Sequence, residues 1–513
     1  MASTALTTIR APRVPASQWW RQWALAPIRR IAKALGLRAY EAATTGRASY
    51  GWNAGAQGPN IEVGAALVTL RQRSRDLARN NSLAGRVLTV LPAALIGEGI
   101  RPQPQTGDAD LDARLLDLWS SWGLDADASG RHDVYGLQLA AVRGWLESGE
   151  SLLRRRWRRP EDGLRLPVQV QLLEGDFIVD TTPTYASDPM AQSLQYGVEV
   201  DAIGRRTAYH LYRRHPGEAY ATTSQESVMV PASEVSHVYQ ATRPGQLRGV
   251  PWLASVMLDL RDLDDVEHAE IVRMKMQACL TAFRRSASLD PVGLSDQVEQ
   301  DDDGRWLETL SPGMIAKLPA GEEIDFLAPQ QFGGFADAVR HYQRVIAVGS
   351  QVPYELLTGD LSGVNYSSIR AGDLEYRRLV SVLRRTVVVP HVCQPLWRWM
   401  VEAAQLAGRL PMLSGETMAR ALHPAWHPPR WVAIDREAEV KADILEMQAG
   451  VRTVAQAAAE RGQDWRALLA QLSAEREEAE ALGLTLSAFG AMSPSQAVTM
   501  PDGVASVPAA DAA

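Results

Sequence analysis

The stretch from Arg243 to Arg285 has the most regular hydrophobic pattern in the chain. Pro251 suits the first turn of a helix, where a missing N–H costs nothing, and Gly249 lets the chain turn in before it. Apolar residues then recur every three or four positions, which places them on one helix face: Leu253, Val256, Met257, Leu260, Leu263, Val266, Ile271, Met274 and Ala278. We therefore predict one helix of about 30 residues, about 45 Å long. A helix of that length is typical of one that runs between regions or packs against copies of itself.

The other face of this predicted helix is acidic. It carries Asp259, Asp262, Asp264, Asp265, Glu267 and Glu270. These carboxylates could be metal ligands, but only His268 accompanies them, so we favour a solvated face.

Two more helices follow after a break. Residues 335–348 have apolar positions at 335, 339, 342 and 346, and we expect this helix to end at Gly349 and to run antiparallel to the first. A polar turn, Leu357 to Ser368, precedes a third helix that Ser367 or Ser368 can cap. Pro390 and Pro395 are expected to kink or end that helix.

The region before the first helix mixes two hydrophobic periods. Residues 61–79, 83–96, 111–122 and 134–147 have helical spacing, whereas strand-like alternation appears around 168–172, 198–200 and 208–212. An α+β domain results. The run Arg154 to Arg159 holds Trp157, and it could contact phosphates by charge and stacking, although a solvated hairpin tip is the favoured interpretation.

The remaining segments read as smaller units. Residues 286–312 are polar, and strand-like pieces follow at Met314–Leu318 and Ile324–Leu327, which predicts a small β-rich module. Near the end, Asp435 and Gly450 bound one helix, Thr453 with Gln456 forms a capping box for a second that stops at Gly462, and Asp464 caps a third. His423 and His427 have the spacing of two zinc ligands on a helix, but the prolines around them argue against that helix.

Several of these segments together resemble the lambda-like phage portal proteins, over roughly residues 60–485. The similar pieces occur in the same order: RDLARNN from Arg75, GEGIRPQP from Gly97, VQLLEGDFI from Val170, GVEVDAIGRRTAYHLYRRHPG from Gly197, HVYQ and then RPGQLRGVPWLA from Arg243, VGSQVPYELL from Val348, NYSSIRA from Asn365, and AGVRTVAQAAAERGQDWRALLAQLSAE near the end.

The resemblance implies an α+β portal-type subunit. Its parts would be a basic N-terminal arm (1–60), a mixed α/β wing (61–250), a first stem helix (251–283), a small β-rich clip (284–330), a second stem helix (335–350), a tunnel loop (357–368), a long helix with the rest of the wing (369–429), a helical crown (430–487) and a disordered tail (488–513). The DNA-facing tunnel loop would include Thr358, Gly359, Asp360, Ser362, Gly363, Asn365, Tyr366 and Ser367, and the stem helices Leu260, Leu263, Val266, Tyr342 and Ile346.

The family also implies partners. These are further copies of the chain in a ring, expected to number twelve, double-stranded DNA in the channel, the terminase large subunit, capsid or scaffold proteins and a head-completion adaptor. The place would be the portal vertex of the virion, with the host cytoplasm during assembly. We expect no catalytic site, no metal and no cofactor.

Composition bears on the alternative, an enzyme of the packaging machinery such as a terminase or a head protease. None of the four lysines follows a glycine, so the chain has no Walker A loop, and no G-x-S-x-G elbow is present. Both cysteines, Cys279 and Cys393, lie in apolar helical patterns and read as buried thiols.

Charge is unevenly distributed along the chain. Residues 1–80 hold 12 Arg or Lys against three acids, and residues 431–513 hold six against 13. The basic, Trp-rich N-terminal arm is broken by Pro27 and is expected to bind a partner or a neighbouring subunit, with a membrane-surface helix as the weaker alternative. No segment is long and apolar enough to span a membrane, and we expect no membrane partner.

Overall fold

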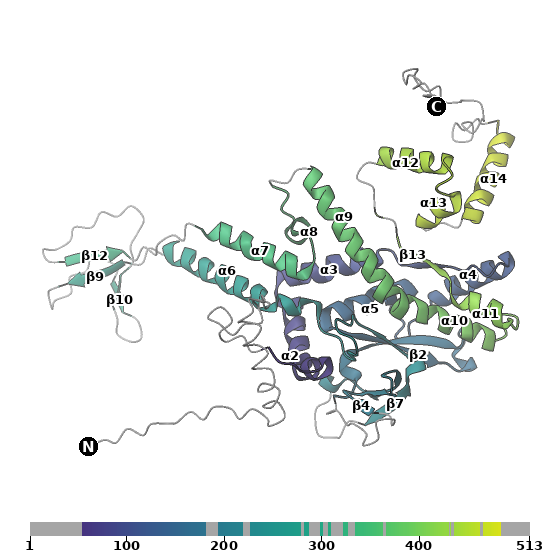
Figure 1. Ribbon diagram of the computed structural model, residues 1–513. Coiled ribbons are helices and arrows are strands. Elements are labelled where there is room, and N and C mark those ends of the chain that lie inside the picture. The colour runs from purple at the N-terminus through teal and green to yellow at the C-terminus, as the bar shows by residue number, and fades with distance from the viewer. Residues whose placement is uncertain are drawn as a thin grey trace, which may run out of the picture. The chain divides into compact units, whose positions relative to one another are not determined.

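The structure is a computed structural model that describes residues 54–180, 193–218, 226–278, 282–286, 298–300, 306–308, 322–326, 334–362, 366–429, 431, 436–461 and 465–483. By its internal contacts, the chain from Pro59 onward is one unit, and Figure 1 labels its helices and strands. Nearly all of the predicted N-terminal arm and the whole predicted tail lie outside the described residues.

Four helices in the first part of the chain confirm the helical spacing. They are α2 (Pro59–Asn80), α3 (Ser82–Ile96), α4 (Ala109–Gly123) and α5 (Val134–Ser148). Asn81, Asp108 and Asp133 cap α3, α4 and α5 with their side-chain oxygens. The buried stripes of α3 and α5 pack against each other, and Trp119 and Trp122 of α4 join Trp397 in the main core.

Two antiparallel sheets form the β part, and their positions confirm the predicted alternation. One sheet has the order β3-β2-β8, from Val168–Glu174, Ser151–Trp157 and Val235–Val238. The other has the order β4-β5-β6-β7, from Ser193–Gln195, Val198–Val200, Arg206–Tyr212 and Ser227–Pro231. A second hydrophobic core, which includes Leu152, Leu173, Leu211 and Val230, lies between them. Short 3-10 turns are η3 (Pro160–Asp162), η4 (Gly175–Phe177), η5 (Pro216–Glu218) and η6 (Ala232–Glu234).

The predicted first long helix is shorter than expected. A 3-10 turn, η7 (Trp252–Ser255), comes first, and α6 runs over Met257–Ala278 with 22 residues. Pro251 is extended (ψ 140°), and the Trp252 indole donates to the Ser350 carbonyl at 2.7 Å, which holds the turn against another helix. At the other end, β9 (Ala282–Ser286) pairs with β12 (Glu322–Phe326), so residues 282–283 belong to a strand and not to the stem helix.

The second long helix, α7 (Phe335–Ser350), confirms the prediction except at its end. Gly349 is inside the helix, and Gln351, with a φ of 57°, is the left-handed C-cap. A Cβ on Gly349 would lie 2.3 Å from Val256, so this glycine permits close packing instead of ending the helix. Since the end of α7 meets the start of α6, and Phe335 lies across a cavity from Met274, the two helices are antiparallel (Figure 1).

The third helix also begins and ends differently from the prediction. After α8 (Tyr354–Thr358), α9 already includes Tyr366 and runs to Leu383, so Ser367 and Ser368 lie within the helix and not before its start. Pro390 does not end the helix: a π-helical segment, η8 (Arg384–Cys393), contains it and continues directly into α10 (Gln394–Leu406). The wider π turn tolerates a residue that lacks an N–H donor.

The remaining elements are small. β10 (Val298–Gln300) pairs with β11 (Trp306–Glu308), and β1 (Arg101–Gln103) pairs with β13 (Ala425–His427), which follows α11 (Gly415–Leu422). The predicted strand Met314–Leu318 lies outside the described residues, whereas Ile324 falls in β12. Among the described residues, no helix combines the length and apolar composition needed to cross a membrane.

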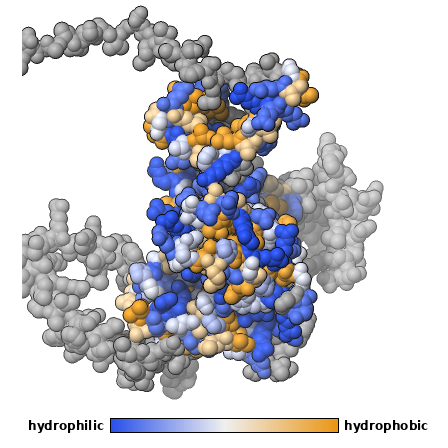
Figure 2. Space-filling model, turned by 90° about the vertical axis from the view of Figure 1, so that its right-hand side faces the viewer, coloured by the Kyte–Doolittle hydropathy of each residue, from blue (hydrophilic) through white to orange (hydrophobic). Residues whose placement is uncertain are grey.

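The C-terminal helices are α12 (Arg436–Gln448), α13 (Val454–Glu460) and α14 (Trp465–Ala481). The predicted capping box is confirmed: the Gln456 amide N–H donates to Thr453 Oγ1 at 3.2 Å, and the Thr453 N–H donates to Gln456 Oε1 at 2.9 Å. Figure 2 shows apolar side chains gathered on the surface of these helices. The exposed ones are Val440, Ile444, Leu445, Val451, Val454, Leu469, Leu472 and Leu482.

Candidate functional site

The α6–α7 pair is the first candidate, because the sequence assigns five of its residues to stem helices. Leu260, Leu263 and Ile346 are buried in the main core, and Tyr342 packs against it. Val266 is 38% exposed. The first half of α6 is therefore packed inside the subunit. The apolar stripe of the helix continues from Val266 onward, where the subunit no longer buries it.

The outer half of α6, residues 266–275, carries large apolar side chains at the surface. Val266, Ile271, Val272 and Met274 are 38–50% exposed. Beside them, α6 and α7 enclose one side of an open cavity of about 470 Å³, lined by Glu267, Glu270, Ile271, Met274, Phe335, Ala336, Val339, Arg340, Gln343, Tyr354 and Asp360.

The acidic face of α6 is largely solvated, with Asp262, Asp264 and Asp265 exposed, and some of its acids also have polar partners. Asp264 accepts a hydrogen bond from Asn81 at 2.8 Å, and Glu270 pairs with Arg273. Burial, followed by the charge of Asp264, raises the pKa of Glu267. Within the described residues, the group that brings three potential metal ligands within 4.8 Å lies elsewhere, at Glu174, Asp176 and His215. Both of its carboxylates pair with Arg75 at 2.6 Å, so arginine already supplies the positive charge there.

The predicted tunnel loop is partly helical and partly an organised turn. Thr358 ends α8, and its Oγ1 donates to the Tyr354 carbonyl at 2.8 Å. Gly359 has a φ of 74°, and Asp360 accepts from the Ser362 N–H at 2.9 Å and the Ser362 hydroxyl at 2.5 Å. The Ser362 hydroxyl is the largest cause that lowers the pKa of Asp360.

The loop boundaries differ from the prediction. Tyr366 and Ser367 belong to the first turn of α9, which begins before the predicted cap. Gly363 and Asn365 lie outside the described residues. The loop does lie beside the α6–α7 pair, since Asp360 and Tyr354 line the same cavity as Ile271 and Phe335. The structure thus brings together two groups of residues that the sequence could only name separately.

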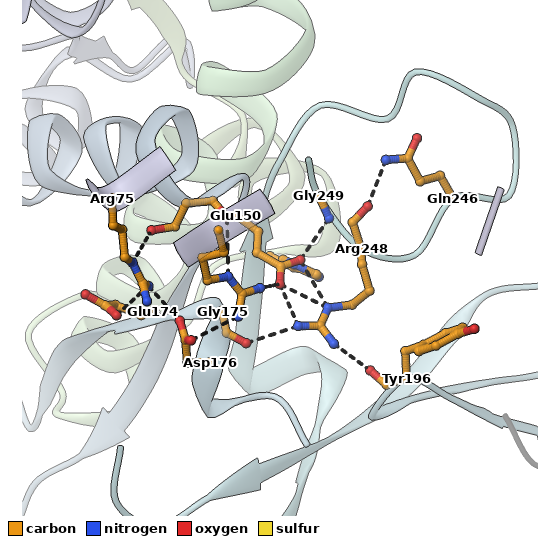
Figure 3. Close-up of polar contacts among 12 residues, drawn as sticks. Arg75, Glu150, Glu174, Gly175, Asp176, Tyr196, Gln246, Arg248 and Gly249 are labelled. Carbon is orange, nitrogen blue, oxygen red and sulfur yellow. Dashed lines mark hydrogen bonds and ion pairs between the residues drawn. The ribbon is translucent and has the colours of Figure 1, made fainter. Parts of the chain in front are cut away.

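A buried carboxylate, Glu150, is the feature that the sequence analysis missed (Figure 3). Its side chain is completely buried where α5 passes into β2. It accepts from Arg71 at 2.7 Å, from Arg248 at 2.6 Å, from the Gly249 N–H at 2.8 Å and from His237 Nε2 at 3.0 Å. Burial alone would raise the pKa of Glu150, but the charge of Arg248, the hydrogen bond from His237 and the charge of Arg71 hold it well below its usual range.

His237 is neutral in this network. Burial lowers the pKa of His237 to about 4, against the opposing effect of Glu150. Its ring therefore donates from Nε2 to the carboxylate, and its Nδ1 has no hydrogen-bond partner among the described residues.

The surrounding contacts extend the network across the β part. Arg75 donates to Glu174 and Asp176 at 2.6 Å, and Arg248 donates to the carbonyls of Gly175 and Tyr196 at 3.1 and 2.9 Å (Figure 3). Four of the motifs that carry the family resemblance, those with Arg75, Glu174, His237 and Arg248, thus contribute to this network. The available signal in the sequence was an acidic residue, Glu150, directly before the strand-forming residues Ser151 to Leu153.

Two adjoining glycines bring the backbone close enough to complete this network. A Cβ on Gly249 would lie 2.0 Å from the Gly149 carbonyl oxygen, and Gly149 has a φ of 89°. Close approach of the two backbones at this point places the Gly249 N–H on Glu150.

The basic run is divided between a strand and a turn. Arg154 to Trp157 belong to β2, whereas Arg158 and Arg159 enter the hairpin turn, where Arg158 pairs with Asp162 at 3.0 Å. Arg155 pairs with Glu234 at 2.5 Å and with Glu402. The hairpin-tip interpretation therefore describes only the end of the run.

Comparison with known proteins gives a consistent result. The model of the phage portal protein, lambda family, matches residues 45–384 of the chain. A probable portal protein of Halomonas phage phiHAP-1 is 26% identical over 438 residues, which cover 81% of each chain. Portal protein B of Escherichia phage lambda is 22% identical over 478 residues, covering 84% of this chain and 89% of the relative. Among solved structures, a chain from the neck of an empty GTA particle aligns with a TM-score of 0.44 at 15% identity, covering 78% of this chain and 93% of that one.

Proposed function

Because the chain belongs to the lambda family of phage portal proteins and has a portal function, we propose that it forms a closed ring of twelve subunits at one capsid vertex. Double-stranded DNA passes through this ring during packaging and ejection. The terminase large subunit, capsid or scaffold proteins and a head-completion adaptor are its partners, first in the host cytoplasm and then in the virion. The family match does not favour the alternative of a terminase or head protease.

One observation carries the ring proposal: the outer half of α6 exposes four large apolar side chains that its own subunit leaves half uncovered. Burial of such a side chain contributes about 1.5–3 kcal/mol when complete, so half-burial of four contributes a few kcal/mol per interface. In a closed ring, two different patches meet at every interface, and each subunit covers the exposed stripe of its neighbour.

The ring proposal is tested by placing charge on this stripe. In the variant Ile271→Lys with Met274→Lys, two ammonium groups would enter the interface, and we expect dimers and monomers in place of a ring of about 674 kDa, twelve times the 56.2 kDa subunit. The matched control is Ile203→Lys with Met412→Lys, which puts the same charges on side chains that are each 88% exposed. Mass photometry reads both variants. Rings of unchanged mass in the stripe variant would contradict the proposal.

We also infer that the loop at residues 359–365 is the part of the ring that narrows the channel. Its support is the position beside the α6–α7 pair and its nearly neutral composition, with Asp360 as its charged residue. Because a ring multiplies each contact by the number of subunits, a cationic loop would hold the passing phosphates and slow the DNA.

A test of this loop needs a position where a positive charge can be added without disturbing the turn. Asp360 organises the turn through Ser362 and Tyr354, so its replacement would alter the loop itself. Leu361 is 65% exposed, and Leu361→Lys adds charge without removing those contacts. We expect intact rings and slower packaging in this variant, most clearly at low salt, with Leu361→Gln as the control. Equal packaging rates for both variants at every salt concentration would place the loop away from DNA.

The pairs β9–β12 and β10–β11 are proposed as the clip, the outward module that receives the terminase. Their place in the chain, between α6 and α7, supports this assignment. Helices α12–α14 are proposed as the crown, with their exposed apolar residues available to neighbouring subunits.

A further inference from the structure

The strand β2 presents a row of arginines that the portal function leaves unexplained. Side chains two apart on a strand lie on the same face, about 6.8 Å apart. Arg154 and Arg156 therefore share one face, and Arg155 lies on the other, where its guanidinium is 4.8 Å from the Trp157 ring centroid. Arg155 forms its ion pairs inside the subunit, with Glu234 and Glu402. The charges of Arg154 and Arg156 are not explained by these pairs.

Arg154 and Arg156 open onto a cavity of about 330 Å³ at the edge of the space between the two sheets. Its lining residues are Arg154, Arg156, Gln171, Leu173, Phe177, Leu211, Tyr212, Arg213 and Val228. The lining thus combines three arginines and Gln171 with two aromatic rings and a smaller apolar floor, and no acid is among these lining residues. The floor continues the second hydrophobic core, to which Leu173 and Leu211 belong.

The positive charge at this cavity is poorly compensated. Within the described part of the chain, neither Arg154 nor Arg156 has a carboxylate within ion-pair distance, and Arg213 has only an exposed pair with Glu226 at 3.4 Å. Burial, and then the charge of Arg156, lowers the pKa of Arg154, while the charge of Glu234, which lines a neighbouring cavity, opposes this. Two guanidinium groups held close together beside an apolar surface repel each other, and a bound anion would relieve this repulsion.

The combination of features identifies the class of ligand. Arginine binds phosphate through two parallel N–H donors, and unpaired bases stack on aromatic or apolar surfaces beside a basic groove. A carboxylate-rich peptide would use the arginines but leave the apolar, aromatic floor uncovered. We propose that this cavity, the β2 arginine site, binds single-stranded nucleic acid, with phosphates on Arg154, Arg156 and Arg213 and a base against Phe177 and Tyr212.

The test is fluorescence anisotropy of a labelled oligothymidylate of about 20 nucleotides, long enough to cover the site, with the full-length protein. In Arg154→Gln with Arg156→Gln, we expect at least a tenfold loss of affinity at moderate salt. The slope of log affinity against log salt should decrease by about 1.4, since each phosphate contact on a single strand contributes about 0.7. The matched control, Arg73→Gln with Arg114→Gln, removes the same charge from exposed positions on α2 and α4 and should change neither quantity.

Three further measurements make the proposal falsifiable. Tyr212→Leu keeps the apolar bulk but removes the aromatic ring, and it should weaken binding about fivefold or more. Competition by a polyglutamate peptide as strong as by unlabelled oligonucleotide would overturn the proposal in favour of an acidic protein partner. Equal loss in the control variant, or no loss in the β2 variant, would also overturn it. Mass photometry of each variant separates these outcomes from a failure of ring assembly.

Discussion

The buried Glu150 network allows a quantitative prediction for Glu150→Gln. The carboxylate balances two buried guanidinium groups, those of Arg71 and Arg248, and accepts a backbone N–H and an imidazole N–H. A glutamine keeps the shape but loses the charge. Its amide NH₂ group would also face donors, so at least one N–H of the network would be left without an acceptor.

The expected cost follows from these contacts. Removal of one partner from a buried ion pair costs about 3–5 kcal/mol, because the other charge stays buried without compensation. Because one carboxylate serves both arginines and glutamine keeps its shape, we expect a single such loss, about 4 kcal/mol in the free energy of unfolding. Glu174→Gln is the matched control: this carboxylate also pairs with arginine at 2.6 Å, but it is 55% exposed, and its replacement should cost less than about 1 kcal/mol.

Urea unfolding at pH 7, followed by tryptophan fluorescence, measures both values. The slope against urea should stay the same while the midpoint moves, which shows that stability and not compactness has changed. If Glu150→Gln and Glu174→Gln lower the free energy of unfolding equally, to within about 1 kcal/mol, then burial does not determine how much these ion pairs contribute to stability.

Three other outcomes follow from the described contacts. First, the pKa of His237 is about 4 in the folded chain against 6.5 ordinarily, so the folded state binds fewer protons; stability should fall as the pH drops from 6.5 towards 4, by up to about 1.4 kcal/mol per pH unit, and unfolding titrations of His237→Gln should show a shallower slope. Second, replacing residues 282–330 with a short Gly/Ser linker should leave rings visible by electron microscopy and abolish DNA packaging, since β9 and β12 leave together; normal packaging would refute the clip assignment. Third, Thr453→Ala should destabilise α13 locally by about 1 kcal/mol, seen as faster amide hydrogen exchange in residues 454–457 than in α12.

Local signals in the sequence predicted the elements better than their ends. The helices with strong periodicity and the capping box at Thr453 depend on residues within a few positions of one another, and the structure confirms them. Gly349 was read as a helix end because glycine is frequent there. Its actual role depends on Val256, about 90 positions away in the chain, which no local pattern reveals.

The Glu150 network shows the same limit more strongly. Its partners Arg71 and Arg248 are 79 and 98 positions away. The family resemblance selected several of the contributing segments, such as the one around Arg248, but it could not show that they meet. The predicted boundary between the candidate loop and α9 was wrong, because the helix already includes Tyr366.

The helical rod from Tyr366 to Leu406, formed by α9, η8 and α10, has a mechanical consequence. Arg384 fixes it near the middle, since its guanidinium donates to the carbonyls of Ala94 and Leu95 at 2.8 Å. From there, α9 extends about 27 Å to the loop at 1.5 Å per residue. A sideways load on the start of α9 would therefore act on this segment, which Arg384 holds at its far end. Beyond Arg384, the helix is packed into the main core around Trp397. A load applied at the start of α9 would therefore reach the body of the subunit through Arg384 and its two carbonyl partners.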